Sequence, residues 1–249
     1  MEHKFQMEIT SMTLHIIAMV CMLCDHLWAT IISGNDWLTC IGRIAFPIFA
    51  FLIVEGYFHT HNLKKYVGRL LLFAIISEIP FNLLMGSRFF YPIHQNVLWT
   101  FLIGIALIYF NEKVKKKNKW WLTIIVVISS IVLAFAIGLL TMVDYYHAGI
   151  FMVLVFYFFR KRTWWNFLAQ IFLLAYINIE ILSGYAYEIQ LFGNTYYFVR
   201  QGFALLALIP IWLYRGKQGP YNKIIKSIYY AFYPVHLFVL ALICMGIGV

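Results

Sequence analysis

Residues 113–141 read KVKKKNKWWLTIIVVISSIVLAFAIGLLT, a group of lysines followed by a run from Trp120 to Thr141 that contains no charged side chain. A membrane-spanning helix needs about 20 consecutive apolar residues to cross a hydrocarbon layer of about 30 Å. The run has that length, and lysines beside such a run are typical of a cytoplasmic connection. The stretch therefore indicates a helical membrane protein.

The composition extends this prediction to the whole chain. Of its 249 residues, 63% are hydrophobic and 12% are charged, whereas a soluble domain is about half apolar and about a quarter charged. The apolar runs are continuous, which favours helices over the alternating strands of a membrane barrel. No polar stretch is long enough to form a soluble domain. We therefore expect residues 1–249 to form a single all-α, multi-pass domain in the plasma or inner membrane of the cell.

Nine apolar segments define the expected helix bundle. They cover residues 11–32, 37–58, 67–85, 95–110, 120–141, 147–159, 166–183, 199–214 and 228–247. The fourth and sixth segments are short for a spanning helix, so re-entrant or buried helices are the alternative for these two. The first segment is interrupted by Asp25 and His26 and no small-residue cleavage site follows it. We therefore expect a retained helix instead of a signal peptide.

The basic residues favour a crossing by every segment. Fifteen of the 19 lysines and arginines lie in every second connection, counted from the N-terminus: Lys4, Lys64, Lys65, Lys113, Lys115, Lys116, Lys117, Lys119, Arg160, Lys161, Arg162, Arg215, Lys217, Lys223 and Lys226. The other connections contain Arg88 alone, and the remaining three arginines lie within or beside the segments. Positively charged connections stay in the cytoplasm, so we predict a cytoplasmic N-terminus and an external C-terminus. These connections are too short to form a nucleic-acid-binding surface, so we do not expect nucleic-acid binding.

Polar side chains inside a membrane are costly and by default mark functional positions. With a rise of about 1.5 Å per residue, a set of them falls at one depth near the outer face: Asp25, His26, Arg43, Glu78, Asn82, His94, Asn96, His147 and Arg200. His236 is placed deeper, in the inner to middle part of the last segment. Mutual pairing that holds the bundle together is one interpretation. We favour the other, a polar site that opens outward.

Helix geometry suggests partners within this set. Asp25 and His26 point about 100° apart on a helix, so they do not form a dyad with each other. A histidine that acts as a base usually has its second nitrogen held by a carboxylate or a carbonyl group. For His26 we predict Glu78 as that partner. We expect Arg43 to pair with Asp25, because an arginine so far from water needs a carboxylate.

A second polar set surrounds the second cytoplasmic connection. Its members are Glu55, His59, His61, Lys64, Lys65 and Arg69. Charged side chains that reach back to the interface are one interpretation, and a cytosolic mouth that binds the phosphates of a donor is the other. No metal site is predicted, because Cys21 and Cys24 lie in an apolar run without further ligands at zinc-site spacing. The chain also lacks the Walker, GxSxG, HExxH and dinucleotide-binding motifs.

Two stretches resemble the signature of the TraX family. They read IGRIAFPIFAFLIVEGYFHT at residues 41–60 and RLLLFAIISEIPFN at residues 69–82. The Asp25-His26 end of the first segment and YPVHL at residues 233–237 are also similar to that family. The resemblance implies a membrane acetyltransferase, since TraX-type proteins are associated with acetylating the N-terminus of conjugative pilin from acetyl-CoA. They also resemble transmembrane acyltransferases that use a histidine within the membrane.

The resemblance implies transfer from cytosolic acetyl-CoA to an extracytoplasmic acceptor, either a secreted pilin-like peptide or a surface glycan. The residues expected to take part in catalysis are His26, Asp25, Glu78, Arg43 and His236. His26, before His236, would remove the acceptor proton, and Arg43, Asn96 or a backbone amide would stabilise the oxyanion. A covalent acetyl-histidine intermediate is an open alternative.

Further roles follow from position. The expected acceptor-binding residues are Asn82, His94, Asn96, His147 and Arg200. The expected donor-binding residues are Glu55, His59, Lys64, Lys65 and Arg69. A proton-coupled membrane transporter is the competing functional class, because carboxylates, arginines and histidines within a bundle also suit proton relays. A structural membrane subunit is the third class.

Overall fold

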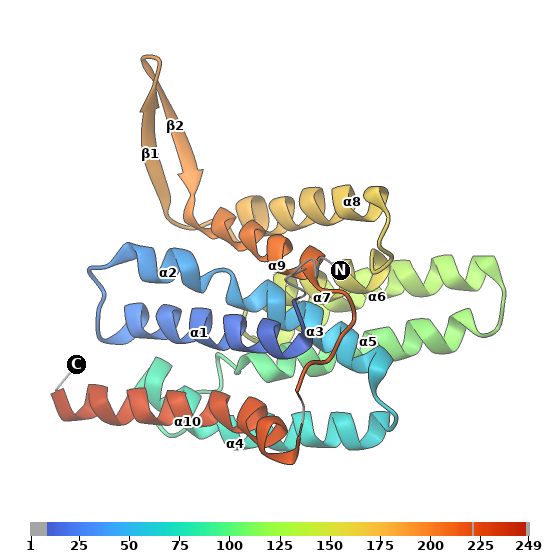
Figure 1. Ribbon diagram of the computed structural model, residues 1–249, viewed down its shortest axis with the longest axis horizontal. Coiled ribbons are helices and arrows are strands. Elements are labelled where there is room, and N and C mark those ends of the chain that lie inside the picture. Colours follow the sequence, from blue (N-terminus) through green and yellow to red (C-terminus); the bar gives the residue numbers. More distant parts are fainter. Residues whose placement is uncertain (1–8, 221, 248–249) are drawn as a thin grey trace, which may run out of the picture.

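The computed structural model describes residues 9–220 and 222–247 as a bundle of long helices with one β-hairpin (Figure 1). The helices are α1 (Ser11–Thr30), α2 (Asp36–Gly42), α3 (Ala45–His59), α4 (Leu63–Gly86), α5 (Val97–Lys115), α6 (Trp120–Leu140), α7 (Tyr146–Phe158), α8 (Trp164–Ala175), α9 (Leu208–Leu213) and α10 (Lys223–Ile247). A π-helix, η1 (Tyr176–Ile181), continues α8, and a 3-10 helix, η2 (Arg200–Ala207), precedes α9. Between them lie the strands β1 (Ala186–Leu191) and β2 (Asn194–Val199).

Six helical segments of the described residues are long and apolar enough to cross a membrane. They are α1, the α2–α3 segment, α4, α5, α6 and most of α10. Two shorter apolar helices are α7 and the η2–α9 segment. The remaining predicted segment, residues 166–183, corresponds to α8 with η1. The predicted class, a polytopic transmembrane helix bundle, is therefore confirmed.

The connections are sorted between the two ends of the bundle. Figure 1 shows the α3–α4, α5–α6 and α7–α8 connections at one end, and the α1–α2 connection and the hairpin at the other. The first group contains most of the basic residues of the internal connections. We call the end of the bundle with the first group the basic end, and the opposite end the hairpin end. This arrangement agrees with alternating crossings, and the assignment of the basic end to the cytosol stays a prediction.

The second membrane segment is broken between α2 and α3, at Arg43 and Ile44. Pro47 has no N–H group, so the carbonyl oxygen of Arg43 lacks the hydrogen bond that a continuous helix would give it. Gly42 allows the end of α2 to approach α1, because a Cβ atom at Gly42 would lie 2.4 Å from Cβ of Asp25. The break therefore brings Arg43 next to α1.

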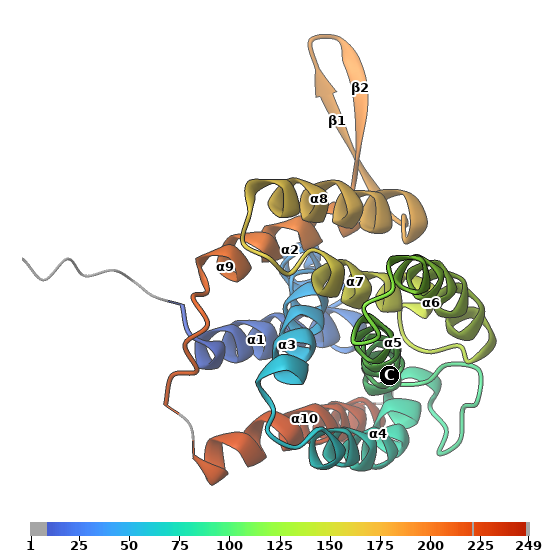
Figure 2. The same cartoon turned by 90° about the vertical axis from the view of Figure 1, so that its right-hand side faces the viewer.

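The hairpin is an addition to the predicted all-α fold. The connection after η1 is an antiparallel pair of strands in which Ala186 pairs with Val199 and Leu191 with Asn194. Phe192 and Gly193 form the turn with φ angles of 52° and 77°, as two-residue hairpin turns require. Figures 1 and 2 show the hairpin extending beyond α8, transverse to the long helices.

Helices α3 and α7 form the centre of the bundle (Figure 2). Ile48 and Val54 on α3, and Ile150 and Met152 on α7, are completely buried. A helix that is enclosed on all sides is apolar around its whole circumference. This explains why α7 resembles a membrane span in sequence although it has only 13 residues.

Candidate functional site

Two histidines meet between α1 and α10. The Nδ1 atom of His26 lies 2.8 Å from the Nε2 atom of His236, and the two ring planes are 6° apart. His236 is buried, and the ring of Phe232 stacks against it with a centroid separation of 4.7 Å. The sequence placed these histidines at different depths, whereas the structure brings them together as a pair.

The protonation pattern of this histidine pair follows from its hydrogen-bond partners. Nδ1 of His236 lies 2.7 Å from the carbonyl oxygen of Phe232. A carbonyl oxygen can only accept, so in a neutral His236 ring Nδ1 carries the proton and Nε2 is the acceptor. His26 therefore donates from Nδ1, and its Nε2 atom keeps a lone pair. Within the part of the chain that the structure describes, His26 Nε2 has no hydrogen-bond partner, so the pair presents an oriented base.

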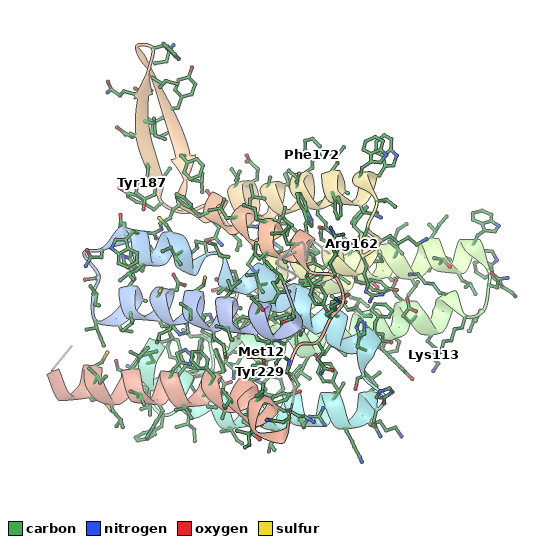
Figure 3. All side chains as sticks on the ribbon, viewed as in Figure 1. Met12, Lys113, Arg162, Phe172, Tyr187 and Tyr229 are labelled. Carbon is green, nitrogen blue, oxygen red and sulfur yellow. The ribbon has the colours of Figure 1, made fainter. Side chains whose placement is uncertain are left out.

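A cavity of about 390 Å³ lies among α1, α3, α4, α5 and α10, toward the basic end of the bundle. Met12 and Tyr229, which are labelled close together in Figure 3, both line it. Its wall extends along α1 from Ser11 to Met22, a length of about 16 Å at about 1.5 Å per residue. This inner cavity is long enough for a thin flexible chain that enters from the basic end.

Helix periodicity connects the inner cavity with the histidine pair. One face of α1 lines the cavity at Ser11, His15, Met19 and Met22. His26 is the next residue on that face, since residues three or four apart lie one above the other. On α10, Phe232 and Tyr233 line the cavity, and their ring centroids lie 4.7 and 5.8 Å from that of His236. The histidine pair therefore lies next to cavity-lining residues on both helices, although neither histidine lines the cavity itself.

Cationic side chains line the same cavity. Arg69 lies over the ring of Tyr230, 5.7 Å from its centroid, and its buried Nε atom has no hydrogen-bond partner among the described residues. Lys226 also lines the cavity. A phosphate group would satisfy such donors, because arginine and lysine form charge-assisted hydrogen bonds with phosphate oxygens.

The predicted donor-binding residues divide into two groups. Glu55, His59 and Arg69 line the inner cavity, whereas the exposed side chains of Lys64 and Lys65 do not. Glu55 already has a partner, because Arg160 donates to it from Nε at 2.6 Å. Arg69 is thus the predicted cation that the structure places in the cavity, and the two lysines stay outside it.

Two residues that line the inner cavity, His15 and Lys226, were not among the predicted site residues. Lys226 was counted only as a topology determinant. The signal for His15 is its position on the α1 face that ends at His26, which periodicity alone could have revealed. Across residues 9–220 and 222–247, no group of three or more His, Cys, Asp or Glu residues could hold a metal ion.

Asp25 and Arg43 form the ion pair that the sequence predicts. Arg43 Nη2 lies 2.5 Å from Asp25 Oδ1, and the Thr39 hydroxyl donates to the same oxygen at 2.7 Å. Arg43 also donates from Nη1 to Gln201 at 3.3 Å, and Gln201 donates to Asn178 at 3.2 Å. This network joins α1, α2, η1 and η2. It does not line the inner cavity, so the expected oxyanion role of Arg43 has no support from its position.

The structure gives Glu78 other partners than the predicted His26. Its Oε2 atom accepts hydrogen bonds from Asn96 Nδ2 and, at 3.0 Å, from Trp99 Nε1. Asn96 Nδ2 also donates to the carbonyl oxygen of Ala74 at 2.9 Å, so both of its N–H groups are used. Glu78 therefore connects α4 to the start of α5, and Asn96 has no N–H group left for an oxyanion.

The other predicted acceptor-binding residues have a variety of local partners. His94 Nε2 lies 3.4 Å from Asp144 Oδ1, and this hydrogen bond raises the pKa of His94 above its usual value. Asn82 donates to the carbonyl oxygen of Phe89. The ring of His147 packs against Phe135 and Phe151, and its buried Nδ1 atom has no hydrogen-bond partner among the described residues. Arg200 lies at the root of the hairpin. These side chains are therefore used in different local contacts, while Arg43 and His94 both interact electrostatically with Asp144, and His94 also with Glu78.

The chain is similar to known proteins along nearly its whole length. Residues 10–244 match the family model described as TraX protein. A protein of Dichelobacter nodosus named "Probable fimbrial assembly protein FimC, serogroup H1" is 28% identical over 257 residues, which cover 95% of this chain and 95% of that protein. No solved structure matches the chain.

Proposed function

The chain belongs to the TraX family, and we propose that it is a membrane acetyltransferase that transfers an acetyl group from acetyl-CoA to a pilin-like peptide. The bundle of apolar helices establishes a multi-pass membrane protein. The name of the Dichelobacter nodosus relative refers to fimbrial assembly. This favours a secreted peptide over a surface glycan as the acceptor.

The observation that carries the proposal is the position of the histidine pair, one helical turn beyond residues of α1 and α10 that line the inner cavity. A donor in this cavity would have its phosphates near Arg69 and Lys226, which both line the wall. Its acetyl thioester would lie at the deep end, beside His26. The acceptor would approach from the hairpin end. CoA would then stay on the basic side of the membrane while the acetyl group crosses.

In the proposed reaction, His26 Nε2 removes a proton from the acceptor amine. The amine nitrogen attacks the thioester carbonyl carbon, a C–N bond forms, and the C–S bond breaks. The proton passes from His26 to the departing CoA thiolate, so the sum of the products is an acetylated amine and CoA thiol. The transient charge on His26 is stabilised through Nδ1 by His236, whose own Nδ1 is held by the Phe232 carbonyl.

An acetyl-His26 intermediate is a variant of this reaction. In that case the Nε2 lone pair attacks the thioester carbon, the thiolate leaves, and the acceptor amine then takes the acetyl group. The two routes differ in what forms without an acceptor. Incubation with radiolabelled acetyl-CoA alone, followed by rapid acid quench, would label the protein only in the covalent route.

The proposal is tested with the purified protein in proteoliposomes. Radiolabelled acetyl-CoA is supplied at the basic end, and synthetic peptides with a free N-terminus are supplied on the opposite side. Label on the peptide together with release of CoA thiol supports the acetyltransferase. Solute flux without labelled acceptor would identify a proton-coupled carrier instead, and the absence of both would identify a structural subunit.

A cavity-filling variant tests the donor site in the same assay. Met22 lines the deep part of the inner cavity, so Met22→Trp should raise the KM for acetyl-CoA by about tenfold or more, because the indole occupies the space of the donor. Met245 is a matched control, since it lies on α10 and is 58% exposed. Met245→Trp should leave the KM unchanged.

A further inference from the structure

A second cavity, of about 250 Å³, lies at the root of the hairpin. Its walls come from the α2–α3 break, the turn before α7, the linker after η1 and the start of η2. The N–H group of Arg200 donates to the carbonyl oxygen of Tyr185 at 2.8 Å, and this bond closes the base of the hairpin. Among the described residues, this outer cavity and the inner cavity share no lining residue.

The backbone around the outer cavity departs from regular helix geometry in several walls. Arg43 marks the break between α2 and α3. Tyr145 and Ser183 have positive φ angles of 60° and 48°, which are unfavourable for residues with a side chain. In membrane proteins, irregular backbone at membrane depth occurs where it is buried in protein or lines a cavity, and broken helices often form binding sites. The surrounding packing must therefore hold these turns in place.

The outer cavity is lined by cations without a matching number of carboxylates. Arg43 and Arg200 both line it, and its lining residues within the described chain include no Asp or Glu. Asp25 compensates Arg43 from outside the cavity, and the buried Nε atom of Arg43 has no hydrogen-bond partner in the described structure. Arg200 forms no ion pair with any residue that the structure describes. It rests over the rings of Trp28 and Tyr185, 4.5 and 5.4 Å from their centroids.

We propose that the outer cavity binds a carboxylate side chain of an extended peptide, and this inference rests on the proposed function in taking that peptide to be the acceptor. The planar guanidinium group of Arg200 is suited to a carboxylate, with which arginine forms paired hydrogen bonds. The cavity volume of about 250 Å³ is large enough for one such side chain. Beside it, β1 and β2 form a two-stranded sheet, so each strand has an unpaired edge that an extended chain could follow.

The test measures peptide binding without any acetyl donor. The full-length protein is reconstituted in nanodiscs of zwitterionic lipid, and the probes are fluorescent heptapeptides that differ only in Glu or Gln at the central position. The Glu peptide should bind about 10- to 100-fold more tightly, as expected for a hydrogen-bonded charge pair. This preference should disappear in Arg200→Gln and persist in part in Arg200→Lys. Arg88→Gln, which removes an exposed cation in another connection at the hairpin end, should keep it.

Three results would overturn the inference. Equal binding of both peptides excludes a carboxylate site, and a preference that survives Arg200→Gln places the site elsewhere. Arg200-dependent binding of free phosphate or of anionic lipid, without the peptide preference, assigns the cavity to those ligands.

The readout is independent of catalysis, so His26→Gln should bind the Glu peptide normally. Acetyl transfer without a Glu preference counts against this inference alone, and a Glu preference without transfer counts against the proposed function alone.

Discussion

His26 Nδ1 and His236 Nε2 lie 2.8 Å apart although 210 residues separate them in the chain. The two histidines differ in which ring nitrogen is free, because the carbonyl oxygen of Phe232 fixes the proton of His236 on Nδ1. His26 thus has the free Nε2 atom and His236 has the orienting role. In the proposed reaction, His26 is the base and His236 is a positioning residue.

Substitutions of His236 test the orienting role. Glutamine can still accept a hydrogen bond from His26 Nδ1 through its amide oxygen, whereas alanine leaves that N–H group without a partner. We expect His236→Gln to reduce kcat by about tenfold or less and His236→Ala by about 100-fold, since an unsatisfied buried donor costs about 1–3 kcal/mol. The KM for acetyl-CoA should not change in either variant. A smaller loss in His236→Ala than in His236→Gln would contradict the orienting role.

The close approach of α1 and α2 predicts a stability effect at Gly42. A Cβ atom at this position would lie 2.4 Å from Cβ of Asp25, so Gly42→Ala should destabilise the protein by about 1–3 kcal/mol through overpacking. Gly68 is the matched control, because a Cβ atom there meets nothing within 4 Å. Gly68→Ala should be neutral or stabilise α4 by up to about 1 kcal/mol. Thermal unfolding in detergent compares the two, and equal melting temperatures would show that α1 and α2 are not packed as described.

The His94–Asp144 pair predicts a pH dependence of stability. The hydrogen bond to Asp144 raises the pKa of His94 in the folded protein, so folding favours the protonated ring. This contribution is fully present below the unfolded pKa of about 6.5 and is lost as the pH rises through the raised folded value. The side chains are 30% and 27% exposed, so the effect should be about 1 kcal/mol or less. His94→Gln should remove this part of the pH dependence of the melting temperature; an unchanged profile would show that the pair does not contribute.

The positive-inside prediction is tested by thiol labelling. In a variant whose native cysteines are replaced by alanine, Gln190→Cys places a thiol on the exposed hairpin and Lys115→Cys places one at the end of α5. An impermeant maleimide should label Gln190→Cys in intact cells and Lys115→Cys only after lysis. The reverse pattern would invert the orientation and would place the inner cavity on the outside.

Membrane physics made much of the fold predictable. Long apolar runs and basic connections identify spanning segments, because lipid tolerates neither charged side chains nor unpaired backbone groups. The hairpin was not predicted, because the connection between the seventh and eighth expected segments contains no long apolar run. Its alternation of Tyr187, Ile189 and Leu191 with Glu188 and Gln190 is a strand pattern, and such alternation differs from the long apolar runs of spanning helices.

The candidate site was less predictable, since depth depends on where each helix begins. The last segment was expected to begin at residue 228, whereas α10 begins at Lys223. This difference moves His236 toward the hairpin end by about 7.5 Å at about 1.5 Å per residue, to a depth similar to that of His26. Glu78 was assigned to His26 by depth alone. Sequence could not reveal that α4 presents this carboxylate to Asn96 and Trp99, because that contact depends on which helices are neighbours.

The most direct test of the central claim, that His26 is the catalytic base, is the single-turnover rate of acetyl transfer by His26→Gln, measured together with acetyl-CoA binding. Glutamine keeps hydrogen-bonding groups but cannot take a proton at neutral pH. The rate should fall by about 10²- to 10⁴-fold, the usual contribution of a general base, and donor affinity should stay within about twofold, well under the 1.4 kcal/mol of a tenfold change. Near-normal transfer by His26→Gln, with loss of transfer in His236→Gln, would contradict the account and move the base to α10.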